Sequence, residues 1–234
     1  MAKQYFDVAD IMKESPETML YLIVGQGGVG KTYSAKFRCV DRFLRFKKKF
    51  SCIRNVTPEI SASALSSTFS DVEEDKRLEW DLYDPEHKYY CFHILPKGAY
   101  FWLVGEDING KLVWLEQFGR IVAISKAEAF KGGAYNDADT ILYDEFISES
   151  KPHPRTKSGL SKIIGTVARK TNPDVKVICC GNPDYAIELN PLIEDLHIDY
   201  AHLQDNTAYY FDRKADDGQI LARNVCFFKV ANYK

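Results

Sequence analysis

The chain has 234 residues, 45% of them hydrophobic, which is enough for a full core and one domain with a small appendage. Its formal net charge of −2 excludes a uniformly basic protein, so any DNA-binding face must be a local patch. The sequence shows neither the apolar core of a signal peptide nor an apolar run of transmembrane length, and we expect a soluble, intracellular protein with no membrane partner.

The spacing of the cysteines and histidines predicts no metal site. The six cysteines lack the C-x-x-C spacing of metal and redox sites, and several lie in apolar runs typical of strands. We expect them to be reduced, buried thiols. The five histidines are scattered along the chain, and we assign them no role. The cysteines are Cys39, Cys52, Cys91, Cys179, Cys180 and Cys226, and the histidines are His87, His93, His153, His197 and His202.

A polar lead-in occupies residues 1–18 and contains two aromatic residues, Tyr5 and Phe6. These rings either pack on the core or flank the adenine ring of a nucleotide, because an aromatic side chain offers both apolar area and a stacking face. The apolar run Met19–Val24 that follows predicts a buried strand.

A glycine-rich loop then joins this strand to the predicted helix Lys31–Phe46. Strand, glycine loop and helix are the context of a phosphate-binding loop, whose glycines let backbone N–H groups close around phosphate oxygens. We expect Lys31 to contact the β- and γ-phosphates of ATP and the Thr32 hydroxyl to ligate Mg²⁺. The predicted nucleotide-binding residues are Gly25, Gln26, Gly27, Gly28, Val29, Gly30, Lys31, Thr32 and Tyr33.

Helical spacing within Lys31–Phe46 predicts which side chains face the sheet, namely Tyr33, Phe37, Val40 and Leu44. The next run, residues 50–56, predicts a second strand, and Pro58 then marks a helix start at residues 57–60. Residues 71–84 are acidic and are expected to form a solvated helix face or loop.

Residues 88–125 differ in composition from the preceding segment, because they contain several short runs of β-forming residues. The dipeptide Asn109-Gly110 between two of these runs is a strong hairpin signal. We expect antiparallel strands that join or extend a parallel sheet. The four runs are residues 89–95, 100–104, 112–115 and 120–124.

A second chemical motif is the apolar run that ends in Asp144 and Glu145, which has the form of a Walker B motif. Asp144, at the carboxyl end of a buried strand, is expected to hold Mg²⁺ through its water shell. Glu145 is placed to orient and polarise an attacking water. This second carboxylate separates water-activating ATPases from many small-molecule kinases, which need no such base.

The chain after this motif predicts a helix, a buried strand and a hairpin. The helix covers residues 156–170, the strand covers residues 175–180, and the hairpin lies between residues 208 and 230. Asn182, just after the strand, is either a sensor of the γ-phosphate or a turn-forming residue before Pro183.

Together these elements predict an α/β protein, a P-loop NTPase of the additional-strand type. Its central sheet should be mostly parallel and flanked by helices, with an antiparallel β insertion before the Walker B motif. We expect an ATPase domain over residues 1–200 and a C-terminal extension or linker over residues 201–234. Ring-forming ATPases complete each site with an arginine from the neighbouring subunit. The candidates are Arg169, then Arg155 and Arg120, each otherwise a solvated surface residue.

The ordered set of motifs resembles the DNA-packaging ATPases of small protein-primed podophages of the Salasvirus type. These are relatives of terminase large subunits and of FtsK/HerA-type translocases. The resemblance spans roughly residues 15 to 195. It is carried by residues 30–36 with Arg42-Phe43, residues 52–54 with Pro58-Glu59, residues 109–112 with Ala134-Tyr135, residues 141–147, and residues 177–182 with Asn190-Pro191.

The resemblance implies a homo-oligomeric ring, expected to be a pentamer, at the portal of a procapsid in the host cytoplasm. Such a ring hydrolyses ATP with Mg²⁺ to drive double-stranded DNA through its pore. By the same resemblance, Arg169 occupies the region of the trans-acting arginine, and Arg54 matches a basic strand-end position that contacts DNA or nucleotide. A second basic residue expected there is replaced by Val56-Thr57. The family also carries a C-terminal nuclease-like domain, and we expect the chain to stop near where that domain begins.

Other parts of this interpretation stay open at the level of sequence. Lys126 and Lys131 are candidate DNA-contacting residues of the pore, or simply part of a solvated loop around Gly132-Gly133. A cellular translocase of the same superfamily would share the fold and the phosphate chemistry. A nucleotide kinase would need an arginine-rich lid, which the sequence does not show. A nucleotide-dependent switch would hydrolyse ATP slowly and independently of DNA.

Overall fold

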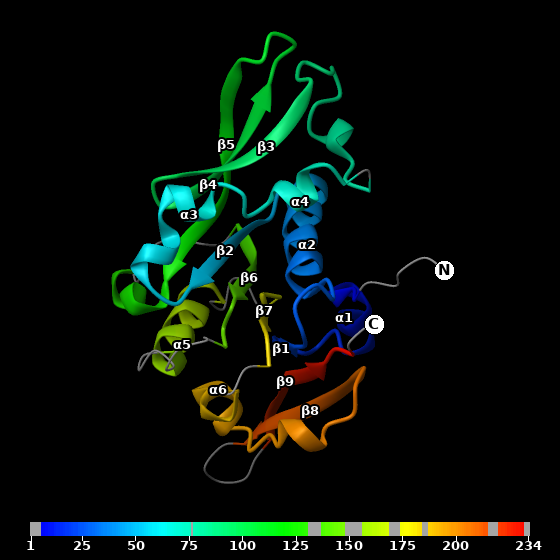
Figure 1. The fold of residues 1–234 in the computed structure, drawn as a ribbon, viewed down its shortest axis with the longest axis vertical. Helices are drawn as coiled ribbons and strands as arrows, with labels where there is room; N and C mark the ends of the chain where they lie inside the picture. Colours follow the sequence, from blue (N-terminus) through cyan, green and yellow to red (C-terminus); the bar gives the residue numbers. More distant parts are fainter. Residues whose placement is uncertain are drawn as a thin grey trace.

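A nine-stranded sheet forms the centre of the part of the chain that the structure, a computed structural model, describes: residues 6–75, 77–130, 137–147, 156–168, 174–183, 187–214 and 220–231. The order of the strands is β3-β4-β5-β2-β6-β7-β1-β9-β8 (Figure 1). The strands are β1 (Leu20–Val24), β2 (Lys49–Arg54), β3 (Cys91–Lys97), β4 (Tyr100–Glu106), β5 (Leu112–Ala123), β6 (Ala138–Asp144), β7 (Lys176–Gly181), β8 (Thr207–Lys214) and β9 (Ile220–Lys229).

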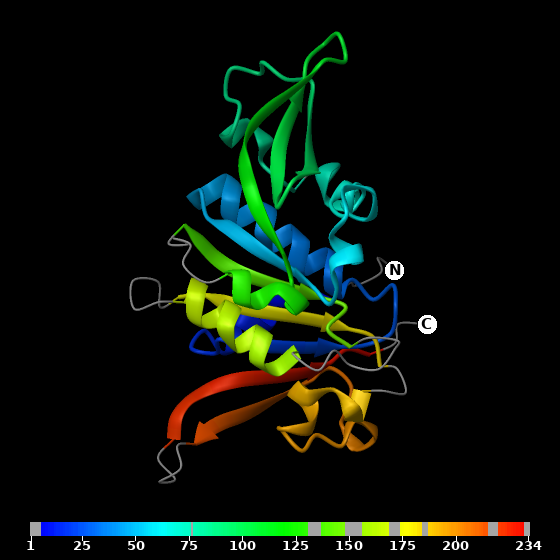
Figure 2. The same ribbon diagram turned by 90° about the vertical axis from the view of Figure 1, so that its left-hand side faces the viewer.

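Helices lie on both faces of this sheet (Figures 1 and 2). The α-helices are α1 (Val8–Glu14), α2 (Lys31–Phe46), α3 (Ala62–Leu65), α4 (Ser70–Glu73), α5 (Thr156–Val167) and α6 (Pro191–Glu194). Short 3₁₀ segments are η1 (Thr57–Ile60), η2 (Trp80–Leu82), η3 (Ile124–Phe130), η4 (Ile187–Leu189) and η5 (Tyr200–His202).

The middle of the sheet is parallel, as expected for near-continuous apolar strands buried on both faces. Strand β7 lies between β1 and β6, and β2 lies on the other side of β6. In β1, Tyr21 and Ile23 pack into the core under α1 and α2, whereas Leu22 and Val24 pack into the core under α5. This alternation is the two-residue period of a strand. The carboxyl ends of β1, β6 and β7 therefore meet along one edge.

The sheet continues as antiparallel strands at both ends. Strands β3, β4 and β5 form the green projection at the top of Figure 1, and the turn at Asn109-Gly110 joins β4 to β5 as predicted. The expectation of two separate strands within residues 112–124 was wrong, because β5 is one strand of 12 residues. Register shifts within the β4–β5 pair bend β5, so that its second half runs parallel to β2.

Helix α2 has the predicted bounds, but the residues of its buried face differ in part from the prediction. Val40 and Leu44 are buried as expected, together with Cys39 and Phe43, whereas Tyr33 and Phe37 are only half-buried. The buried stripe of α2 is therefore turned toward Cys39 and Phe43. Helix α5 begins at Thr156 as predicted, and the expected end at Lys170 lies outside the described residues.

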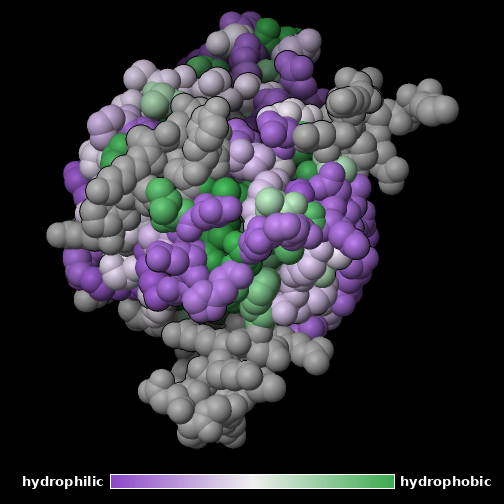
Figure 3. Space-filling model, turned by 60° about the horizontal axis from the view of Figure 1, so that its bottom comes forward, coloured by the Kyte–Doolittle hydropathy of each residue, from purple (hydrophilic) through white to green (hydrophobic). Residues whose placement is uncertain are grey.

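The C-terminal hairpin belongs to the same sheet, since β9 pairs in parallel with β1 and antiparallel with β8. The boundary predicted at residue 200 stays a prediction. Over the described residues beyond it, β8 and β9 continue the sheet next to the strand that leads into the glycine loop. Figure 3 looks at this end of the molecule, where apolar side chains gather among polar ones. Exposed apolar residues of its elements include Leu189 in η4 and Tyr210 in β8.

Candidate functional site

The glycine loop between β1 and α2 has a backbone that only glycine adopts without strain. Gly28 and Gly30 have positive φ angles of 81° and 96°. At Gly25, a Cβ atom would lie 2.8 Å from Cβ of Val230, the residue after β9. Gly30 is the N-cap of α2 and makes no side-chain cap, which leaves N–H groups of the first turn for an anion.

Lys31, the first residue of α2, is folded back onto the loop that precedes it. Its Nζ donates to the carbonyl oxygens of Gly25 at 2.6 Å and Gln26 at 2.8 Å, and to Oδ1 of Asn182 at 3.2 Å. Burial lowers the pKa of Lys31, and the nearby Cys180 and Asp144 oppose that shift. Asn182 follows β7, so strand order brings the loop lysine and the predicted sensor together.

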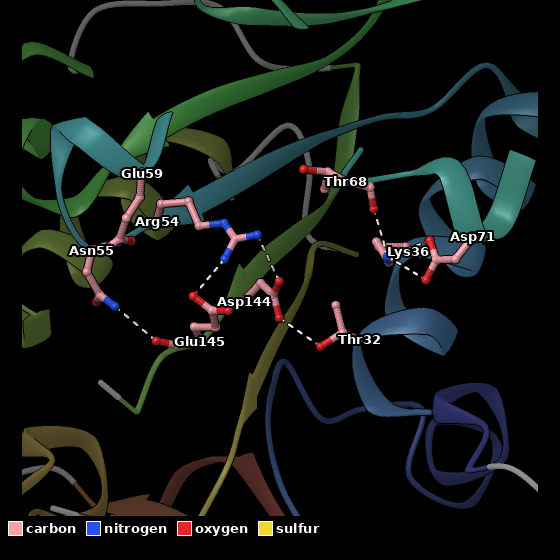
Figure 4. Close-up of polar contacts among 9 residues, drawn as sticks. All are labelled: Thr32, Lys36, Arg54, Asn55, Glu59, Thr68, Asp71, Asp144 and Glu145. Carbon is pink, nitrogen blue, oxygen red and sulfur yellow. Dashed lines mark hydrogen bonds and ion pairs between the residues drawn. The ribbon is translucent and has the colours of Figure 1, made fainter. Parts of the chain in front are cut away.

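Thr32 and Asp144 meet at the same edge of the sheet. The Thr32 hydroxyl donates to Oδ1 of Asp144 at 2.8 Å (Figure 4). Asp144 ends β6 and is buried, as its position at the end of a strand covered on both faces requires. A hydroxyl and a carboxylate are hard oxygen ligands of the kind that Mg²⁺ takes from proteins, so the two residues fit the predicted metal role.

Arg54 lies between Asp144 and Glu145, the two acidic residues of the predicted Walker B motif. Its Nη2 is 3.1 Å from Oδ2 of Asp144, and its Nη1 is 3.0 Å from Oε2 of Glu145 (Figure 4). Burial alone would lower the pKa of Arg54, but the negative charges around it, led by Asp144, raise it overall. Its side chain is only 13% exposed. The guanidinium is thus directed toward Asp144 and Glu145, and a contact of Arg54 with DNA or nucleotide stays a prediction.

Glu145 combines an exposed side chain with an uncommon backbone. Its φ is 56°, in the left-handed region that costs a non-glycine residue of order 1–3 kcal/mol. Its carbonyl oxygen accepts a hydrogen bond from Nδ2 of Asn55 at 2.9 Å, and the Tyr143 hydroxyl donates to Oδ1 of Asn55. The Asn55 N–H donates to Oε2 of Glu59 at 3.0 Å. Asn55 therefore holds the turn that presents Glu145.

Sequence reasoning missed Asn55 and the role of Arg54. The available signal was their position at the carboxyl end of β2, but that signal needs the order of the strands. The polar end of β2 meets the end of β6 only because the two strands are neighbours in the sheet.

One cavity of about 1580 Å³ lies at this edge of the sheet, and its lining includes Lys31, Thr32, Asn55, Asp144, Glu145 and Asn182. At its far end lie Phe6, Tyr33 and Phe37 with the ion pair of Asp75 and Arg77. The Arg77 guanidinium stacks 4.3 Å from the Phe37 ring centre, and the Tyr33 hydroxyl donates to Asp75. This end offers aromatic faces beside a hydrogen-bonding pair, which suits a planar base.

The two interpretations of Phe6 turn out to be compatible. The Phe6 ring is 8% exposed and lies 5.6 Å from the ring of Phe228, so it packs on the core. The residue also lines the cavity, and its N–H donates to the carbonyl oxygen of Val29 in the glycine loop at 3.2 Å. Tyr5 lies outside the described residues.

The remaining predicted residues lie away from this cavity or outside the described residues. Lys126 is exposed in η3. Arg120 is in β5, where its guanidinium lies 5.5 Å from the ring centre of Tyr100. Lys131, Arg155 and Arg169 fall outside the described residues, so the pore and trans-arginine assignments stay predictions. Among the described helices, none is both long enough and apolar enough to cross a membrane.

Comparison with known proteins gives one family and several relatives from Bacillus phages. The family model of the Podovirus DNA encapsidation protein (Gp16) matches residues 1–193. The DNA packaging proteins of Bacillus phages phi29 and PZA are each 29% identical over 171 residues, which cover 72% of this chain and 44% of the relative. The chain therefore spans less than half of the length of the curated relatives that it matches.

Solved structures of proteins from bacteriophage phi29 have a similar fold. The crystal structure of the N-terminal domain of the DNA packaging ATPase from bacteriophage phi29 matches with a TM-score of 0.64 at 22% identity. The match covers 96% of this chain and 95% of that domain. The phi-29 viral genome packaging motor assembly matches with a TM-score of 0.57 at 21% identity, over 97% of this chain and 57% of that one. At these identities the likeness concerns the fold.

Proposed function

Since the chain belongs to the Podovirus DNA encapsidation protein (Gp16) family, we propose that it is an ATP-hydrolysing motor domain that translocates double-stranded viral DNA into a preformed capsid. In this proposal it acts in the host cytoplasm as one subunit of a homo-oligomeric ring, a pentamer, at the portal of the procapsid. The fold is then a P-loop NTPase of the additional-strand type. The position of β7 between β1 and β6 supports this assignment, as do the antiparallel strands that precede β6. The relation to terminases and FtsK/HerA translocases stays a prediction.

The observation that carries the proposal is the meeting of the two motifs at one sheet edge. Lys31 and Thr32 begin α2, whereas Asp144 ends β6 and Glu145 follows it. Thr32 and Asp144 are nevertheless hydrogen-bonded, and Lys31 reaches Asn182 just after β7. A loop for phosphate, two oxygen ligands for a cation and a carboxylate beside them are the parts that phosphoryl transfer to water requires.

The roles of the residues follow from this geometry. The loop amides and Lys31 bind the phosphates, which replace the carbonyl oxygens that Lys31 contacts here. Thr32 and Asp144 would hold Mg²⁺, which would supply positive charge to neutralise the phosphate oxygens. Glu145 accepts a proton from the attacking water as the water oxygen bonds to the γ-phosphorus and the bond to the bridging oxygen breaks. Asn182 senses the terminal phosphate.

A nucleotide-dependent switch is a second candidate that one observation favours. The Glu145 carboxylate is ion-paired with Arg54, which competes with water for its oxygens. If this pair persists when ATP binds, binding would reshape the site without efficient turnover.

Steady-state ATP hydrolysis, with and without double-stranded DNA, tests the proposal. We expect Glu145→Gln to lower turnover by roughly 10²–10⁴, as for loss of a general base. The exposed Glu188 in η4 gives the matched control Glu188→Gln, which should leave turnover unchanged.

Each outcome separates the candidates. Stimulation by DNA supports the motor, and hydrolysis without stimulation keeps the ATPase but removes DNA as its activator. Tight ATP binding without hydrolysis supports the switch. Phosphate transfer to an added nucleoside in place of water would contradict the assignment as a motor.

A further inference from the structure

Three metal-ligating side chains lie on one face of the β3–β4 hairpin, at the far end of the sheet from the glycine loop (Figure 1). Cys91 begins β3, and its directly opposite partner in β4 is Glu106. His93 is two residues further along β3, so its side chain points to the same face as that of Cys91. The register of the antiparallel pair thus gathers a thiol, an imidazole and a carboxylate that are scattered in sequence.

Two of the three separations between the donor atoms match those of a tetrahedral zinc centre. Cys91 Sγ lies 3.4 Å from Nε2 of His93 and 3.5 Å from Oε2 of Glu106. Zinc with tetrahedral bonds of about 2.3 Å to sulfur and 2.0–2.1 Å to nitrogen or oxygen keeps its donors roughly 3.3–3.6 Å apart. Nε2 of His93 and Oε2 of Glu106 are closer, at 2.8 Å, so they share a hydrogen bond that a bound ion would replace.

We propose that Cys91, His93 and Glu106 form a zinc site, with the Cys91 thiolate, Nε2 of His93 and a Glu106 carboxylate oxygen as ligands and water in the fourth position. The thiol proton of Cys91 and the proton of the hydrogen bond between Nε2 of His93 and Glu106 leave to solvent as the zinc–sulfur and zinc–nitrogen bonds form. A soft thiolate with an imidazole selects zinc over the hard cations Mg²⁺ and Ca²⁺, so the site is chemically distinct from Thr32 and Asp144.

The largely buried carboxylate of Glu73 contacts Nδ1 of His93, the ring nitrogen that the proposed zinc does not use. Oε2 of Glu73, in α4, is 3.4 Å from Nδ1 of His93, and Oε1 of Glu73 accepts the N–H of Ile94 at 2.8 Å. The Glu73 side chain is only 12% exposed, so this carboxylate is fixed. A carboxylate on the second nitrogen places a proton on Nδ1 and leaves the Nε2 lone pair for a metal, the arrangement common to zinc-bound histidines.

The cluster also has an approach from solvent. A cavity of about 340 Å³ opens beside it and is lined by Cys91, His93 and Glu73 together with His87 and aromatic residues of the loop before β3. Cys91, His93 and Glu106 are each part-exposed, so an ion can reach them without unfolding of the hairpin. Zinc here would tie β3 to β4 and, through Glu73, to α4.

Metal titration of the whole chain tests the site. The metal-free protein, in excess Mg²⁺, is titrated with Zn²⁺ against a chromophoric chelator, and with Co²⁺ by absorption spectroscopy. We expect one tight equivalent of zinc and, for cobalt, a thiolate charge-transfer band with the intense visible bands of tetrahedral geometry.

Variants then assign the ligands. Cys91→Ser should abolish the charge-transfer band. His93→Gln should lower the affinity for zinc by roughly 10–100-fold or more, since loss of a residue that only supports a ligand already costs that much. Glu73→Gln should lower the affinity for zinc by roughly 10–100-fold and leave the charge-transfer band in place. His202→Gln, which removes an exposed histidine paired with Asp199, is the control and should change neither.

Either of two results would overturn the proposal. One is no zinc binding that competes with the chelator. The other is zinc binding that Cys91→Ser and His93→Gln leave unchanged, which would place the ion elsewhere. Circular dichroism and ATP binding check that each variant is folded, since the nucleotide cavity does not include these residues.

Discussion

The guanidinium of Arg54 lies 3.0 Å from the carboxylate of Glu145, the residue that we propose accepts a proton from water. The same guanidinium is 3.1 Å from Asp144, so one cation balances both acids at the end of β6. A bound Mg²⁺ would bring positive charge to the same place. In the proposed function, Arg54 and the metal would therefore stabilise the same carboxylates in the absence and presence of nucleotide.

Replacing Arg54 should destabilise the nucleotide-free protein more than the nucleotide-bound one. In Arg54→Gln, the buried Asp144 loses a charged partner, which costs about 2–3 kcal/mol. Thermal unfolding with and without Mg²⁺-ATP measures this. The decrease in stability caused by Arg54→Gln should be smaller when Mg²⁺ and ATP are present. Arg45→Gln, at an exposed ion pair with Asp41, is the control and should change stability little. An equal loss in both states would contradict the shared role.

Removing the charge of Asp144 should weaken the dependence on Mg²⁺ rather than the fold of the loop. In Asp144→Asn the hydrogen bond from Thr32 can persist, but the cation loses a charged ligand worth about 1.5–3 kcal/mol, or roughly 10–100-fold in the Mg²⁺ concentration required. A Mg²⁺ titration of ATP binding measures the shift. Asp174→Asn, at an exposed position before β7, is the matched control. An unshifted titration would remove Asp144 from the metal site.

Glycine-to-alanine changes should have opposite signs at two positions. Gly28→Ala places a Cβ at φ 81°, which costs about 1–2 kcal/mol and narrows the approach to phosphate. Gly165→Ala lies within α5, where a Cβ meets open space, and should stabilise the protein by about 0.5–1 kcal/mol. Denaturant unfolding measures both, and ATP binding should weaken only in Gly28→Ala. Similar stability changes in the two variants would contradict the left-handed loop geometry.

Tyr21 should make stability fall at alkaline pH. Burial raises the pKa of Tyr21 from 10.0 to about 12, although its hydrogen bond with Ser15 opposes the shift. Between these values the folded state holds a proton that the unfolded state has lost, so the free energy of unfolding falls as pH rises from about 10 to 12. Tyr21→Phe should flatten this fall, measured by denaturant unfolding across the range. Tyr90→Phe, at an exposed tyrosine, should leave it unchanged.

Local sequence signals predicted the parts of the fold that depend on neighbouring residues. The bounds of α2 follow from the glycine loop before it, and the β4–β5 turn follows from Asn109-Gly110, and both are confirmed. The single strand β5 was not predictable in this way, since its two halves pair with different partners, β4 and β2.

The candidate site divides along the same line. The glycine loop and the acidic pair Asp144 and Glu145 could be proposed from sequence because each motif is contiguous. Arg54 and Asn55 act through β6, and Cys91, His93 and Glu106 meet only through the register of a hairpin. These contacts depend on strand order and register, which the spacing of residues in the sequence does not predict.

The close approach of Val230 to Gly25 places the C-terminal hairpin directly against the glycine loop. Val230 follows β9, donates its N–H to the carbonyl oxygen of Val24 at 2.8 Å, and fills the space that any side chain at residue 25 would need. Because β9 is also paired with β1, the C-terminal hairpin contacts both the strand and the loop that precede α2. A displacement of Val230 would therefore change the packing at the base of the glycine loop.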